Sequence, residues 1–186
     1  MHMREYMLLT YQEAADKKGG RNGLNKALES GELHRIARNL YANTDNISSL
    51  ASISKLYPNA IITGLTALYL HGLTDVPPEK IDLVTKRGGT KISKPQIRQT
   101  YIPDDWINIG ASYIHQDGIK IRAYDLERML LELMRSRNKI PRDLYKEAVN
   151  SYRRRADELN IYKLEDYANR IPRGHAYLNR ALEEVF

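Results

Sequence analysis

Glycine divides the first 44 residues into two short helical segments and a pair of strands. Thr10 and Glu13 have the spacing of a capping box, in which a hydroxyl and a carboxylate each satisfy a backbone N–H at a helix start. We therefore expect a helix over residues 11–18, which Gly19-Gly20 ends. The double glycine therefore predicts a tight turn before the next segment.

The second helical segment follows at once. Asn22 has the side chain of a helix cap, and Leu24, Ala27 and Leu28 follow the i, i+3, i+4 pattern of one buried helix face. Gly31 then ends the segment. The pattern predicts a short amphipathic helix with its polar side chains on the opposite face.

Two short strands are expected next, over residues 33–37 and 40–42, joined by a turn at Arg38-Asn39. The order of helix, tight turn, helix and hairpin is that of a winged helix-turn-helix, whose second helix enters the major groove while the wing lies against the backbone. Residues 1–44 are therefore predicted to form a DNA-binding domain. Ahead of the helix pair, residues 1–9 allow only a short helix or an edge strand such as 6–9.

The remaining residues, 45–186, predict a mixed α+β domain that ends in three or four helices. A helix of about 47–57 would close the open side of the first domain; a buried strand at 60–62 and a helix over 64–71 capped by Thr63 follow. Alternation of period two then predicts strands at 81–83, 97–102, 106–109, 112–115 and 119–121. Asp125 is expected to cap the first carboxy-terminal helix, and Pro141 to open the next.

Charge points to a polyanionic partner. Lys and Arg number 29 against 23 Asp and Glu, a net charge of +6, with the excess toward both ends and dense in 80–101 and 128–155. We expect a cytoplasmic protein without a membrane span or secretory signal, because no apolar run is long enough for either. Zero cysteines exclude disulfides and thiolate zinc sites.

No catalytic residue, metal ligand or cofactor site is predicted. Two-metal nucleotidyl transfer needs two carboxylates at i and i+2 of a strand, but Asp82 is followed by Val84, and Asp75 lies before a Pro-Pro break. The five histidines contain no i, i+4 pair, and neither a Gly-x-Ser-x-Gly elbow nor a phosphate-binding loop is present.

DNA contact is predicted for the polar face of the second helix and for the hairpin. Asn and Arg can each make bidentate hydrogen bonds to a base edge, and Lys can pair with phosphate. A helical hairpin with ordinary solvated side chains is the alternative. The predicted contacts are Arg21, Asn22, Asn25, Lys26, Arg35, Arg38 and Asn39.

Three blocks of the sequence resemble the AbiEi family of bacterial antitoxins: ALESGELHRIARNLYA (27–42), TGLTALYLHGLTD (63–75) and YDLERMLLELMR (124–135), with NIYKLEDYANR (160–170) also fitting. The resemblance implies a winged-helix autorepressor that binds inverted repeats in its own promoter. It also implies an antitoxin of a type IV system, opposing a nucleotidyltransferase toxin without a stable complex. The larger domain would then be a degenerate nucleotidyltransferase-like fold.

The wing departs from the family pattern, because Arg38-Asn39 replaces a common Arg-Gly turn; Asn tolerates the left-handed conformation that such a turn needs. A second tier of DNA contacts lies on the larger domain, where Lys86, Arg87, Lys91 and Lys94 could engage flanking phosphates. Two other functions stay open: a nucleotidyltransferase acting on nucleotides or RNA, and a protein-interaction module whose basic face meets an acidic partner.

Overall fold

The computed structural model describes residues 7–116 and 118–186. The chain is mixed α+β and divides into two compact units. The first unit takes the chain up to Pro58 together with His115–Ile121, and the second unit holds Asn59–Ile114 and Arg122–Phe186. Within the described ranges, no helix combines the length and the apolar character needed to cross a bilayer.

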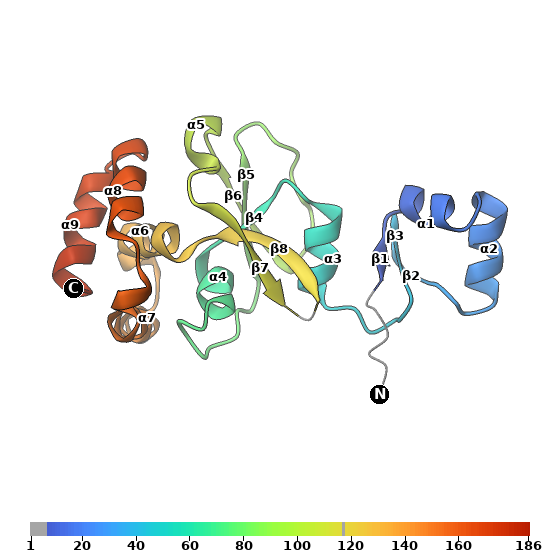
Figure 1. Ribbon diagram of the computed structural model, residues 1–186, viewed down its shortest axis with the longest axis horizontal. Helices are drawn as coiled ribbons and strands as arrows, with labels where there is room; N and C mark the ends of the chain where they lie inside the picture. Colours follow the sequence, from blue (N-terminus) through green and yellow to red (C-terminus); the bar gives the residue numbers. More distant parts are fainter. Residues whose placement is uncertain (1–6, 117) are drawn as a thin grey trace. The chain divides into compact units, whose positions relative to one another are not determined.

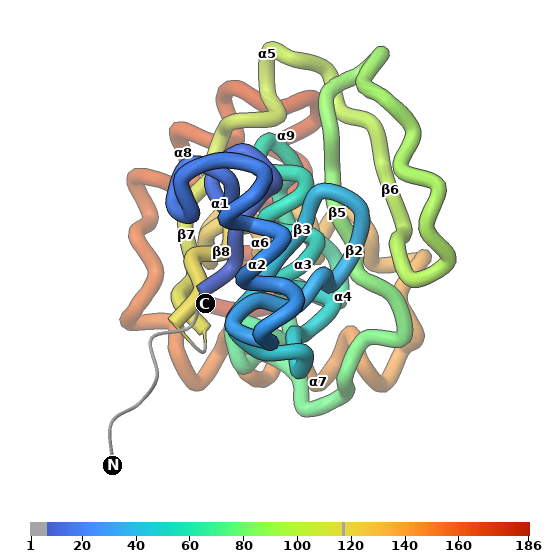
Figure 2. Tube along the Cα trace, turned by 90° about the vertical axis from the view of Figure 1, so that its right-hand side faces the viewer, coloured from blue at the N-terminus to red at the C-terminus, as the bar shows by residue number. Residues whose placement is uncertain are grey.

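The first unit contains a small antiparallel sheet and the helix pair (Figure 1). Its sheet has the order β1-β3-β2, and β1 is the edge strand expected near residues 6–9, of which residue 6 lies outside the described part. Figure 2 shows α1 and α2 next to one another, with the β2-β3 hairpin beside α2. The elements are β1 (Leu8–Leu9), α1 (Tyr11–Lys17), α2 (Arg21–Glu29), β2 (His34–Ala37), β3 (Leu40–Ala42) and α3 (Ser49–Leu56).

Local signals set the bounds of α1, as predicted. The Thr10 N–H donates to Glu13 Oε2 at 2.7 Å and the Glu13 N–H donates to Thr10 Oγ1 at 3.4 Å, which completes the capping box. Gly19 ends the helix at φ +72°, and the Gly20 N–H donates to the Ala15 carbonyl at 2.7 Å. This is a Schellman-type stop, which a residue with a side chain accommodates poorly.

The predicted cap of α2 is wrong. Gly20, at φ +104°, occupies the cap position, so the helix begins at Arg21, and Asn22 is its second residue without a capping bond. The reason is that the turn is short: the chain reverses at Gly19 and Gly20, and α2 begins at the next residue. Leu24 and Ala27 are buried as expected and Leu28 is partly buried.

A compact core holds the helix pair to the hairpin. Ala14, Leu24, Ala27, Leu33 and Tyr41 form it, with Met7, Leu9 and Leu28 packed against it. The two helices meet closely at Gly23, where an added Cβ would lie 1.8 Å from the carbonyl oxygen of Lys18. Gly23 therefore allows a backbone approach that fixes how α2 lies beside α1.

The second unit is built on a five-stranded mixed sheet in the order β6-β5-β4-β8-β7, although the end of β7 and the start of β8 fall within His115–Ile121 and group with the first unit. β4 pairs antiparallel with β5 and parallel with β8, while β5 and β6 are parallel. The helix α4 packs on β5 and on α6. The elements up to the last strand are β4 (Ile61–Ile62), α4 (Gly64–Leu70), β5 (Ile81–Lys86), β6 (Ile97–Ile102), α5 (Asp104–Ile107), β7 (Ala111–Gln116) and β8 (Ile119–Tyr124).

Two local predictions fail in this unit. The strand expected at 106–109 is replaced by α5, because Pro103 and the acidic pair Asp104-Asp105 favour a helix start and the apolar run is too short to decide its own period. Thr63 stands at the cap position of α4 but its side chain makes no capping bond. Asp82 of β5 supplies that bond instead, accepting from the Leu65 N–H at 3.0 Å.

Four helices follow the sheet and gather at one end of the second unit in Figure 1. They are α6 (Leu126–Ser136), α7 (Arg142–Arg154), α8 (Ile161–Arg170) and α9 (Gly174–Glu184), with 3₁₀ turns at Arg137–Lys139 and Ala156–Glu158. Asp125 caps α6 as predicted, accepting from the Arg128 N–H at 2.9 Å. α6 packs against α4, α8 and α9 and is buried almost throughout.

The buried face of α6 includes an ion pair. Arg128 is fully buried and pairs with Glu132 at 3.0 Å, and its guanidinium also donates to the carbonyls of Trp106 and Ile109. The ring of Tyr124 lies 4.6 Å from the guanidinium carbon. A buried charge needs such complete partnering, so α6, α5 and the end of β8 are tied together here.

Candidate nucleic-acid interface

The polar face of α2 is open to solvent. Arg21, Asn22, Asn25, Lys26 and Glu29 are all exposed, opposite the buried Leu24 and Ala27. At about 100° per residue, the five exposed positions cover a continuous arc of about 140°. We call these five residues the α2 strip. Four of them are predicted contacts, and α2 brings them onto one surface.

The cations of the α2 strip and of the hairpin are unpaired within the described residues. Within residues 7–116 and 118–186, Arg21, Lys26, Arg35 and Arg38 take part in no ion pair and no side-chain hydrogen bond. Nearby lysines differ: Lys18 pairs with Glu32, and Lys55 pairs with Glu13 at 2.7 Å. The Lys55 ammonium donates a hydrogen bond to the Glu13 carboxylate and thereby lowers the pKa of that carboxyl. Positive charge thus stays available on α2, on the hairpin and at the exposed Lys17 of α1, whereas Lys18 and Lys55 are neutralised.

The hairpin carries Arg35, Arg38 and Asn39 on exposed positions. β2 and β3 pair antiparallel from His34 opposite Ala42 to Ala37 opposite Leu40, with an irregularity between Arg35 and Ala37. Asn39 adopts the left-handed conformation that we expected of it, at φ +63°. The turn is therefore a two-residue connection whose second residue needs glycine or asparagine.

Asn39 also ties the hairpin to α1. Its side-chain oxygen accepts a hydrogen bond from the Tyr11 N–H at 3.0 Å, which satisfies one free amide at the start of α1. Tyr11 is 40% exposed and its ring lies 6.3 Å from that of Tyr41. Asn39 therefore holds the hairpin in position, and only its side-chain NH₂ group remains for a ligand.

Sequence reasoning missed two residues that shape this surface, Gly23 and Tyr11. A glycine inside a helix costs about 1 kcal/mol relative to alanine, so Gly23 was itself a sign of close packing. Nothing local marks Tyr11, because its bond to Asn39 spans 28 positions.

The second-tier cations lie in the second unit. Lys86 ends β5, Arg87 follows it, and Lys91 and Lys94 lie on the connection to β6. The first three are exposed and Lys94 is partly buried. The side chain of Gln99 anchors this connection: its oxygen accepts from the Ile92 N–H at 2.8 Å and its NH₂ donates to Thr85 Oγ1 at 2.7 Å and to the Thr90 carbonyl.

Asp82 is held inside the fold. One oxygen caps α4 and the other lies 3.2 Å from the Arg98 guanidinium, without the geometry of a hydrogen bond. Burial raises the pKa of this carboxyl and Arg98 opposes that rise. We expected Asp82 to be a strand-end or salt-bridging residue; it does form the salt bridge, from the second position of β5. Val84 on the same strand is buried.

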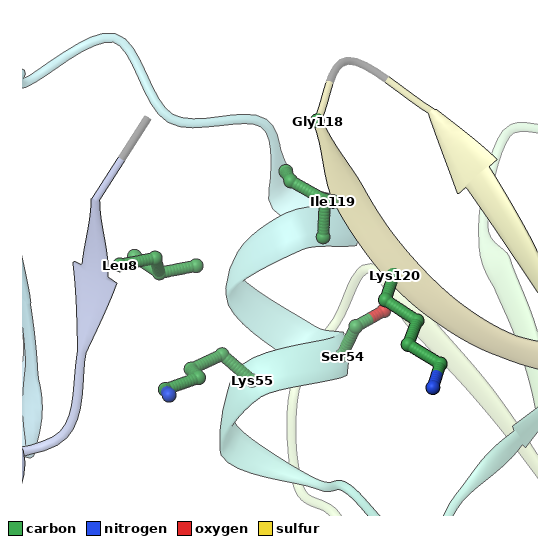
Figure 3. Close-up of a pocket in the computed structure, with 6 residues that line it drawn as sticks. All are labelled: Leu8, Ser54, Lys55, Gly118, Ile119 and Lys120. Atoms are coloured by element: carbon green, nitrogen blue, oxygen red, sulfur yellow. The ribbon is translucent and has the colours of Figure 1, made fainter. Parts of the chain in front are cut away.

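Other candidate sites are weaker. In the described ranges, no group of three or more His, Asp or Glu side chains is placed to hold a metal ion. A pocket of about 240 Å³ in the first unit is lined by Leu8, by Ser54 and Lys55 of α3, and by residues 118–120 at the start of β8 (Figure 3). None of these residues belongs to α2 or to the hairpin, and Lys55 is already paired with Glu13.

Compared with protein-family models and with curated proteins, the chain matches none. What the surface does is therefore inferred from its own side chains.

Proposed function

We propose that the chain is a sequence-specific DNA-binding protein whose first unit is a winged helix-turn-helix. In this proposal α2 is the recognition helix, the β2-β3 hairpin is the wing, and the protein represses transcription from its own promoter at inverted repeats.

The observation that carries the proposal is the α2 strip together with the unpaired arginines of the hairpin. Asn22 and Asn25 can bind adenine edges and Arg21 can bind guanine, while Lys26, Arg35 and Arg38 can pair with phosphates. The Glu29 carboxylate can accept a hydrogen bond from the amino group of cytosine, and it repels phosphates that come close to it. Unpaired cations beside exposed asparagines supply the side chains that phosphate pairing and base reading require.

We further propose that the protein is an antitoxin of the AbiEi type, in which the second unit is a degenerate nucleotidyltransferase-like domain. The basis is the three sequence blocks at 27–42, 63–75 and 124–135. Its functional partner would be a nucleotidyltransferase toxin, opposed without a stable complex.

Salt-dependent DNA binding tests the wing. Each pairing of a cation with a phosphate contributes about 0.9 to the magnitude of the slope of log Kobs against log[salt], so Arg35→Ala with Arg38→Ala should reduce that magnitude by about 1.8 on the upstream promoter duplex. Lys18→Ala is the matched control, because it removes a cation that already pairs with Glu32. Equal slopes for the wing variant and the control would show that Arg35 and Arg38 do not pair with phosphates, and that the hairpin is not a DNA-binding wing.

The antitoxin role is tested by co-expression with the product of the adjacent reading frame. If that product is a nucleotidyltransferase, its inhibition of growth should be relieved by this chain, although the two proteins do not co-purify. Growth inhibition that persists at full expression of this chain would refute the role.

A further inference from the structure

The helix α7 has one face in the core and one in solvent. Leu144, Tyr145, Ala148, Val149 and Tyr152 are buried on the first face. At about 100° per residue these positions occupy an arc of about 140°. The other side of the helix is exposed, and there the exposed positions include Arg142, Lys146, Asn150 and Arg153.

Three of these residues form a straight row of positive charge, which we call the α7 stripe: Arg142, Lys146 and Arg153. The spacing of 4 and then 7 positions places them within about 40° of one another around the helix, and about 6 Å and 10 Å apart along its axis. The result is a row roughly 16 Å long, parallel to the helix. Asp143 is also exposed, but it lies about 60° or more from each of the three cations around the helix.

The stripe stands out because two of its three cations have no partner, while neighbouring arginines are engaged. Across the described part of the chain, Arg142 and Lys146 have no ion-pair or hydrogen-bond partner. By contrast, Arg137 pairs with Glu184 at 3.1 Å, and Arg155 pairs with Glu158 at 2.8 Å. Arg154 donates to Ser151 Oγ at 2.8 Å.

Arg153 is fixed at the end of the stripe. Its Nε donates to the carbonyl of Glu184 at 2.6 Å, near the end of α9, and Nη1 donates to Asn150 Oδ1 at 3.4 Å. These bonds hold the guanidinium in place and leave further N–H donors on an exposed residue. A cation positioned in this way loses less side-chain entropy when it binds an anion.

We infer that the α7 stripe is a phosphate-binding surface for duplex DNA, separate from the α2 strip. A row of cations along one straight helix complements the regularly spaced charges of a duplex backbone. Both tyrosines of α7 are buried, so the stripe offers no aromatic ring on which an unpaired base could stack, which favours a duplex over a single strand. Binding here is expected to be independent of sequence, because contacts between cations and phosphates carry no sequence information.

The inference goes beyond the function proposed above and does not require promoter-specific binding, so it is tested on a duplex of random sequence. In the full chain, Arg142→Gln with Lys146→Gln removes two cations that have no partner within the described residues. Lys80→Gln with Arg173→Gln is the matched control, because within the described residues these two exposed cations of the second unit also have no partner and lie off α7.

Fluorescence anisotropy of a labelled random duplex, measured over a series of salt concentrations, gives the binding constant of each variant. The α7 variant should reduce the magnitude of the slope of log Kobs against log[salt] by about 1.8, and the control should leave it unchanged. Equal slopes for the two variants, or tighter binding of single-stranded RNA or of polyglutamate than of the duplex, would overturn the inference. If the wild type binds promoter and random duplexes equally, the repressor proposal fails while the α7 comparison still stands.

Discussion

Replacing Gly23 by alanine should destabilise the first unit, although alanine is the better helix former. Helix propensity alone predicts a gain of about 1 kcal/mol. In the structure the new Cβ would lie 1.8 Å from the Lys18 carbonyl oxygen, where ordinary contact begins near 3.4 Å, so the peptide group that follows α1 and the first turns of α2 must move apart by about 1.6 Å. Overpacking of this kind costs about 1–3 kcal/mol, and the upper end applies because the obstacle is backbone. We expect a net loss of about 1–2 kcal/mol.

Amide hydrogen exchange at Leu24 and Ala27 measures this loss within the first unit, without the second unit contributing to the signal. Asn25→Ala is the control, because it adds the same residue to the same helix at an exposed position and should raise protection slightly. Protection in Gly23→Ala equal to or above that of the control would refute the close approach of the two helices.

Three further predictions concern single side chains. Asn39→Ala should destabilise the hairpin by about 1–2 kcal/mol, because alanine adopts the left-handed backbone conformation less readily than asparagine and cannot accept the hydrogen bond from the Tyr11 N–H. Faster hydrogen exchange of the Tyr11 amide measures this loss. Arg128→Met should cost about 1.5–3 kcal/mol in urea unfolding followed by tryptophan fluorescence, because Glu132 loses its buried partner although it keeps its pairing with Arg135. Burial, and then the hydrogen bond to Asp125, raise the pKa of Tyr167 to about 12 from an ordinary value near 10. The folded state thus keeps this proton longer than the unfolded state, so stability should be full below pH 10 and decline between pH 10 and about 12.

Each of these has its own control. Asn39→Gly keeps the turn conformation and loses only the bond, so it should fall between wild type and Asn39→Ala. Arg128→Met combined with Glu132→Leu should recover much of the loss, and no recovery would contradict the assignment to a buried charge deprived of its partner. Tyr167→Phe should reduce the decline of the free energy of unfolding at alkaline pH. An unchanged dependence of that free energy on pH would show that Tyr167 does not contribute to the decline.

Local signals predicted the elements whose ends are set by neighbouring residues. The Thr10–Glu13 capping box, the Gly19-Gly20 stop and the Asp125 cap all appear in the structure as expected. The left-handed Asn39 was also predicted, because few residues other than glycine accept that conformation.

Non-local contacts account for what sequence reasoning missed. Asp82 caps α4 from a strand 17 positions away, so Thr63 looked like the cap although it makes no such bond. Arg128 pairs within the fold, as the sequence suggested, and its bond to Glu132 is a local i, i+4 contact. The carbonyls of Trp106 and Ile109 that also accept from its guanidinium come from elsewhere in the chain and could not be predicted. The α2 strip was predicted because it depends only on helical period, whereas the bond from Tyr11 to Asn39 required the fold.

The affinity ratio between the upstream promoter duplex and a random duplex, measured for wild type and for Asn25→Ala, tests whether α2 recognises DNA sequence. We predict a wild-type ratio of about 10³ or more. Asn25→Ala should weaken promoter binding by about 5-fold to 150-fold, the equivalent of about 1–3 kcal/mol, and leave random DNA unaffected. A wild-type ratio near one, or an equal loss on both duplexes, would contradict a recognition role for α2.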